Sequence, residues 1–120
     1  MDMHTRKDGD IRVFSMSGRL TIADAGEKLG APFRQWIDAG DRRFLFQMAD
    51  VPYLDSAGVG ELVACAKRAY ERGGVVKVVS PSGSKTRQIF SMTGLEKVFE
   101  TFENESDALA SFPALPAKGD

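Results

Sequence analysis

The stretch Asp55-Ser56-Ala57-Gly58-Val59-Gly60 decides the fold, because the chain changes character on either side of it. The residues just before it, Phe44 to Ala49, are nearly all apolar, which predicts a short strand covered on both faces. The residues that follow, Val59 to Tyr70, repeat apolar side chains at helical spacing and predict a helix. We therefore expect Ser56 at a strand-to-helix turn, where capping side chains and free backbone N–H groups gather.

The hydroxyl of Ser56 has two interpretations at such a turn. It is either a plain helix cap or a group presented for chemistry, and the short motif alone favours the cap because such motifs match by chance. The predicted helix buries a face with i, i+3, i+4, i+7 and i+11 spacing, which comprises Val59, Leu62, Val63, Ala66 and Tyr70. Its outward face comprises Ala57, Glu61, Ala64 and Arg68. Small residues beside Ser56 leave room for a large protein to approach.

Apolar periodicity along the rest of the chain predicts one α/β domain. We expect a mixed, mostly parallel sheet of four to five strands with about four helices packed on it. The predicted strands are Met3–Arg6, Ile11–Leu20, Phe44–Ala49, Val75–Val79 and Val98–Phe102. The predicted helices are Asp24–Asp38, Val59–Tyr70, Lys85–Thr93 and a last segment capped by Asn104 or Ser106. For the helix Lys85–Thr93, Ser82 or Ser84 is the predicted cap and Gly94 the predicted stop. The strand–helix–strand order around Ser56 implies a right-handed crossover between parallel strands.

The first predicted helix contains three local signals. Asp24 and Glu27 resemble a capping box at its start. Pro32 is expected to kink or restart the helix, because proline lacks the N–H group that a helix interior needs. Gly40 fits the stop of the helix.

Length and composition bound the class of protein. The 120 residues suffice for one domain, which we assign to residues 1–112, followed by a flexible C-terminal tail at residues 113–120. The 16 basic and 17 acidic residues are well mixed and give a net charge of −1, which argues against a nucleic-acid or membrane surface. The single cysteine, Cys65, cannot form an internal disulfide and favours a cytoplasmic location. The polar start resembles no secretory signal, and no apolar run approaches a membrane span.

A phosphate on Ser56 would act on the surface rather than on the fold. It would add about −1.5 to −2 charges and three acceptor oxygens. The N–H groups and the dipole of the helix N-terminus would favour it by about 0.3–1 kcal/mol. A partner seated over the same patch would bury an unpaired charge, next to the carboxylates of Asp55 and Glu61. The sequence therefore predicts a binding switch without large refolding.

The stretch from Asp55 to Gly60 resembles the Asp-Ser-Ser/Thr-Gly-Leu-Gly phosphorylation motif of bacterial anti-sigma factor antagonists. These are stand-alone domains of the STAS family (sulphate transporter and anti-sigma factor antagonist). Further matches at the expected spacing extend the resemblance over residues 10–112. They are Ser17-Gly18-Arg19-Leu20, Gly73-Gly74, Ser80-Pro81 and Phe90-Ser91-Met92-Thr93-Gly94-Leu95. Two departures stand out: Ala57 replaces the second Ser or Thr, and Thr21 and Ile22 stand where many members have an aspartate.

The resemblance implies a function and its partners. Ser56 maps onto the phosphoacceptor, and the kinase is an anti-sigma factor with a histidine-kinase-like ATP site. The unphosphorylated antagonist binds that kinase and frees the sigma factor, phosphorylation breaks the complex, and a metal-dependent serine phosphatase restores it. We expect partner contacts at Asp55, Ser56, Ala57, Gly58, Gly60, Glu61, Ala64 and Arg68. We expect no catalytic residue, metal or cofactor, and a monomer or weak dimer.

Two other function classes are open from the sequence. A STAS adaptor, on a transporter ATPase or in a sensory assembly, would use the same surface as a permanent dock without a phosphorylation cycle. A small enzyme has little support, because the only histidine is His4 and no convincing nucleophile–base pair or metal cluster accompanies it. We therefore predict a regulatory binding protein and not an enzyme.

Overall fold

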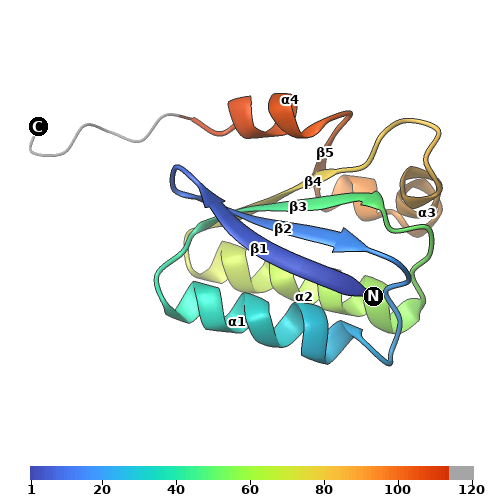
Figure 1. The fold of residues 1–120 in the computed structure, drawn as a ribbon, viewed down its shortest axis with the longest axis horizontal. Helices are drawn as coiled ribbons and strands as arrows, with labels where there is room; N and C mark the ends of the chain where they lie inside the picture. The colour runs from blue at the N-terminus through green and yellow to red at the C-terminus, as the bar shows by residue number, and fades with distance from the viewer. Residues whose placement is uncertain (114–120) are drawn as a thin grey trace, which may run out of the picture.

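The computed structural model describes residues 1–113, and within them one five-stranded sheet organises the chain (Figure 1). The strands lie side by side in the order β1-β2-β3-β4-β5. They are β1 (Asp2–Asp8), β2 (Ile11–Ser17), β3 (Arg43–Asp50), β4 (Val75–Val79) and β5 (Glu100–Phe102). The β1–β2 pair is antiparallel and the other three pairs of these described strands are parallel, which confirms the mixed, mostly parallel sheet.

The helices form two unequal layers on the sheet. Within residues 1–113 they are η1 (Ala25–Gly30), α1 (Ala31–Asp38), α2 (Ser56–Glu71), α3 (Lys85–Thr93), η2 (Leu95–Lys97) and α4 (Glu105–Ala110). The first three α-helices cover one face and α4 covers the other (Figure 1). The larger core lies under the first three and contains the fully buried rings of Phe14, Phe33 and Phe46. A smaller core under α4 includes Leu45 and Ala108.

Helix ends and turns mostly follow local signals. Gly94 has a φ of 79°, in the left-handed region that favours glycine, and it ends α3 as predicted. Gly18 has a φ of 91° and follows Ser17, so β2 ends before the predicted strand does. Ser84 caps α3 and Asn104 caps α4, because each side chain accepts a hydrogen bond from the backbone N–H three residues on. The sequence had left two candidates for each of these caps.

The first predicted helix is divided into two. η1 is a π-helix that continues directly into α1 at Ala31, and Pro32 lies in the first turn of α1, where the hydrogen-bonding pattern changes. The predicted capping box is wrong, because Asp24 makes no side-chain hydrogen bond to the start of the helix. The last predicted strand is also shorter, since η2 occupies the chain just before it and β5 begins at Glu100.

The buried face of α2 differs from the predicted one. Val63 and Tyr70, which we expected inside, are 40% and 84% exposed. The buried residues are Gly58, Leu62, Cys65 and Ala69. Three of these four are small, which lets the helix axis approach the sheet, so the spacing of larger apolar side chains indicated a neighbouring face. Val59 and Ala66 are half-buried at the margin of the larger core.

The segments after the parallel strands meet at one end of the sheet. Because β2, β3 and β4 run in the same direction, residues 18–24, 51–55 and 80–84 all follow their carboxyl ends. This end of a parallel sheet is where binding sites most often form. The start of α2 lies here, at the right of Figure 1. Ser56 is the first residue of this helix.

Candidate functional site

Ser56 is the first residue of α2, and its side chain is exposed. The residue before it, Asp55, is in the extended region (φ −91°, ψ −176°) and is the N-cap. The Asp55 Oδ1 atom accepts a hydrogen bond of 2.8 Å from the backbone N–H of Gly58. The cap is therefore Asp55, and the hydroxyl of Ser56 is free of that role.

The carboxylate of Asp55 joins two loops. While Oδ1 accepts from Gly58, Oδ2 accepts a hydrogen bond of 2.9 Å from the backbone N–H of Ile22, which follows β2. Hydrogen bonds from the N–H groups of Gly58 and then of Ile22 hold the pKa of Asp55 below its ordinary value. Asp55 is thus a negative charge beside Ser56 at neutral pH, with both oxygens engaged inside the molecule.

Backbone hydrogen bonds hold the same two loops together. The N–H of Leu20 donates to the carbonyl oxygen of Tyr53 over 3.0 Å, and the N–H of Asp55 donates to the carbonyl oxygen of Leu20 over 3.3 Å. Leu20 also forms an isolated parallel bridge with Leu54. We call this contact between residues 18–24 and residues 53–58 the Ser56 junction.

Gly58 allows the Ser56 junction to close. A Cβ atom at this position would lie 2.4 Å from the carbonyl oxygen of Leu20, closer than real Cβ atoms approach. Gly60, one helical turn after Ser56, is exposed and has open space where its Cβ would be. The two glycines of the motif therefore have different roles, since Gly58 permits close packing and Gly60 leaves the surface flat.

The residues predicted to contact a partner differ in how far they are exposed. Ser56, Gly60 and Ala64 are exposed. Those that are half-buried are Asp55, Ala57, Glu61 and Arg68, and Gly58 is buried. The prediction that Glu61 lies on the outward face is wrong. The carboxylate of Glu61 turns toward Gly30 and lies 3.8 Å from the guanidinium of Arg34, because the helix is rotated relative to its predicted orientation.

Three apolar residues near this site were missed by sequence reasoning. Ile22 is 79% exposed, and Tyr53 and Val63 are 42% and 40% exposed. Ile22 and Tyr53 belong to the Ser56 junction, and the guanidinium of Arg19 lies 4.7 Å from the ring centre of Tyr53. Ile22 stood out in the sequence only as a departure from the family pattern. In the sequence, only this departure could have drawn attention to Ile22.

The hydrogen bonds that Asp55 accepts change the environment that a phosphate on Ser56 would meet. The N–H of Gly58, one of the groups that would have received the phosphate, already donates to Asp55. A phosphate would therefore meet an ionised carboxylate at the helix start and fewer free donors. This weakens the predicted stabilisation and strengthens the predicted repulsion of a partner.

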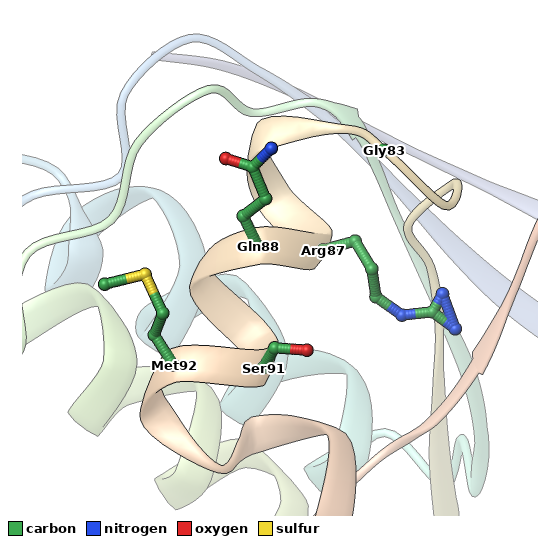
Figure 2. A pocket seen from close by; sticks show the side chains of 5 residues that line it. All are labelled: Gly83, Arg87, Gln88, Ser91 and Met92. Carbon is green, nitrogen blue, oxygen red and sulfur yellow. The ribbon is translucent and has the colours of Figure 1, made fainter.

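The described residues also form a pocket outside the predicted site residues. A pocket of about 470 Å³ on α3 is lined by Gly83, Arg87, Gln88, Ser91 and Met92, which are labelled in Figure 2. These side chains point in different directions, and Arg87 donates to the Ser80 carbonyl oxygen over 3.2 Å and to Thr101 Oγ1 over 2.6 Å.

Neither the thiol of Cys65 nor a metal-binding cluster adds reactive chemistry to the described residues. Burial raises the pKa of the Cys65 thiol, so it stays protonated. Within the described residues no group of three His, Cys, Asp or Glu side chains is arranged to hold a metal ion. No helix in this part of the chain has both the length and the apolar character required to cross a membrane. The predicted tail, except for Pro113, lies outside the described residues.

Comparison with known proteins places this geometry in a family. The family model described as the STAS domain matches residues 2–108. The chain belongs to the STAS domain family. A curated relative from Thermotoga maritima, named "Putative anti-sigma factor antagonist", is 26% identical over 100 residues, which are 83% of this chain and 88% of that protein.

Solved structures share the fold of this STAS domain. An anti-sigma factor antagonist from Mycobacterium paratuberculosis has a TM-score of 0.80 at 23% identity, covering 92% of each chain. The Bacillus cell fate determinant SpoIIAA, in its phosphorylated form, has a TM-score of 0.70 at 19% identity, covering 91% of this chain and 97% of SpoIIAA. At these identities the likeness concerns the fold alone.

Proposed function

We propose that this STAS domain is an anti-sigma factor antagonist that acts as a phosphorylation-controlled binding switch. The unphosphorylated form binds an anti-sigma factor that is also a serine kinase, and the sigma factor is released. The observation that carries the proposal is the exposed Ser56 hydroxyl at the first residue of α2, relieved of capping by Asp55. The names of the relatives point to the same class of protein.

Electrostatics at the Ser56 junction supports the switch. A phosphate adds about −1.5 to −2 charges at pH 7, directly beside the ionised Asp55. A partner that covers Ser56 would have to bury this charge beside the like-charged Asp55 carboxylate, which is unfavourable. The fold itself tolerates the change, because the Ser56 side chain makes no hydrogen bond that holds the described elements together. Phosphorylation would therefore release the partner without unfolding the domain.

The partner surface of this switch is narrower than the sequence predicted and displaced from it. It comprises Ser56, Gly60, Val63 and Ala64 on α2, with Ile22 and Tyr53 from the loops beside them. A metal-dependent serine phosphatase would reset the switch by removing the phosphate. We place the cycle in the cytoplasm, where ATP is available to the kinase, and assign no catalytic residue to this chain.

Phosphate mapping tests the proposal. The purified chain is incubated with ATP and a cell extract of the source organism, then digested and analysed by mass spectrometry. We expect one phosphate, on Ser56, and none on the matched Ser56→Ala variant. A phosphate elsewhere, or an unmodified chain that still binds a partner stably, would contradict the switch and favour the permanent adaptor instead.

A further inference from the structure

Ile22 is an apolar residue whose side chain is exposed to solvent near Ser56. It is 79% exposed, more than either Tyr53 or Val63 near the same site. Isolated exposed apolar residues are common, so exposure alone assigns no role. The position of Ile22 carries more weight, because its own backbone N–H donates to Asp55, the residue that precedes Ser56.

The backbone around Ile22 is fixed on both sides. Before it, the N–H of Leu20 donates to the Tyr53 carbonyl oxygen over 3.0 Å. After it, the N–H groups of Asp24 and Ala25 donate to the Thr21 carbonyl oxygen over 2.9 and 2.8 Å. These bonds hold the backbone on both sides of Ile22, and with it the outward direction of the side chain. A preorganised apolar group of this kind binds without a large ordering cost.

We propose that Ile22 is the apolar anchor of the kinase that phosphorylates Ser56, an inference that rests on the proposed function. The occupant of this surface is an ATP-dependent serine kinase with an apolar socket beside its phosphoryl-transfer site. Continuity argues for this partner, since one carboxylate, Asp55, bonds both the Ile22 backbone and the first turn of the helix that carries Ser56. Asp55 is then a positioning residue, which sets where the anchor stands relative to the hydroxyl.

Tyr70 provides a matched comparison. It is 84% exposed, like Ile22, but it lies near the other end of α2. At 1.5 Å of rise per residue, about 21 Å of helix separates it from Ser56. A general need for apolar surface would involve both residues, whereas an anchor at the transfer site involves only Ile22.

The test measures initial rates of Ser56 phosphorylation in the source-organism extract, with labelled ATP and varied concentrations of the chain. For Ile22→Asp we expect the apparent KM to rise at least tenfold, because a buried apolar contact becomes a charge. Ile22→Val should stay within threefold of the wild type, since it keeps most of the apolar surface. Tyr70→Asp should stay within twofold. Thermal melting confirms that each variant is folded, as the exposure of both side chains predicts.

Two results separate the possible failures. A wild-type chain that receives no phosphate on Ser56 overturns the proposed function and this inference with it. A wild type that is phosphorylated normally, with Ile22→Asp within twofold of Tyr70→Asp, overturns the anchor alone. If Ile22→Asp melts early, Ile22→Ser replaces it, with a fivefold or greater rise in KM expected and an unchanged KM contradicting the anchor.

Discussion

The two ends of the sheet use an aspartate in opposite ways. At the Ser56 junction, Asp55 binds backbone N–H groups and leaves a hydroxyl outside. At the other end, Asp41 is only 8% exposed and pairs with Lys7 and Arg12, each through a nitrogen–oxygen distance of 2.9 Å. The guanidinium of Arg12 lies 3.6 Å from the ring centre of Trp36. We call these four residues, Lys7, Arg12, Trp36 and Asp41, the Asp41 cluster.

The comparison shows that the partner of a carboxylate decides whether the surface around it can bind another protein. In the Asp41 cluster the carboxylate and the cations satisfy each other, so little remains for a partner to bind. At the Ser56 junction the carboxylate is satisfied by backbone donors, and its charge stays next to an accessible alcohol. The Asp41 cluster should therefore govern stability, and the Ser56 junction should govern binding.

The largest expected effect on stability is at the Asp41 cluster. Replacing Asp41 by alanine leaves the Arg12 side chain, 11% exposed, without its carboxylate. We expect the free energy of unfolding, measured with urea, to fall by about 3 kcal/mol. Asp38→Ala is the control, because Asp38 and its partner Arg72 are 65% and 45% exposed. It should change stability by less than about 0.5 kcal/mol. Equal effects of the two variants would contradict the contrast.

The two glycines of the motif give the next largest effect. Gly58→Ala places a Cβ against the carbonyl oxygen of Leu20 and should lower the free energy of unfolding by about 2 kcal/mol. Gly60→Ala meets open space and should raise it by about 0.5–1 kcal/mol, because alanine favours the helix. Thermal or urea unfolding of both variants measures these changes in the free energy of unfolding. A neutral Gly58→Ala would mean that the two loops need not approach so closely.

The smallest effect concerns pH. Partial burial alone would raise the pKa of Asp41, but hydrogen bonds from Lys7 and Arg12 outweigh it and hold the pKa below the ordinary value of 3.8. A lowered native pKa contributes stability above the unfolded pKa, which is lost as pH falls through the native pKa. The stability gap between wild type and Asp41→Asn should therefore be constant from pH 7 to about pH 5 and narrow below about pH 4. A stability gap that widens in acid would contradict a lowered pKa of Asp41 in the native state.

Local patterns in the sequence predicted most of the fold. The strand at Val75–Val79 has its predicted bounds, and the α3 and α4 caps lie at predicted residues. These features depend on side chains within a few positions of one another. The rotation of α2 depends instead on how closely Gly58, Cys65 and Ala69 let the helix approach the sheet, which is a property of the packed layers.

The candidate site was predicted in outline and not in detail. The position of Ser56 at the start of a helix followed from apolar periodicity on each side of the motif. The link from Asp55 to Ile22 joins residues 33 positions apart, so no local pattern could reveal it. Glu61 was misplaced for the same reason, since its neighbour Gly30 belongs to another helix.

The central claim is that negative charge on Ser56 prevents binding while the fold survives. Its most direct test is the dissociation constant of the Ser56→Ala and Ser56→Asp chains for the purified kinase that phosphorylates the wild type. We predict that Ser56→Asp binds at least tenfold more weakly than Ser56→Ala, a difference of about 1.4 kcal/mol, with similar melting temperatures. Equal affinities of the two folded variants would contradict the account.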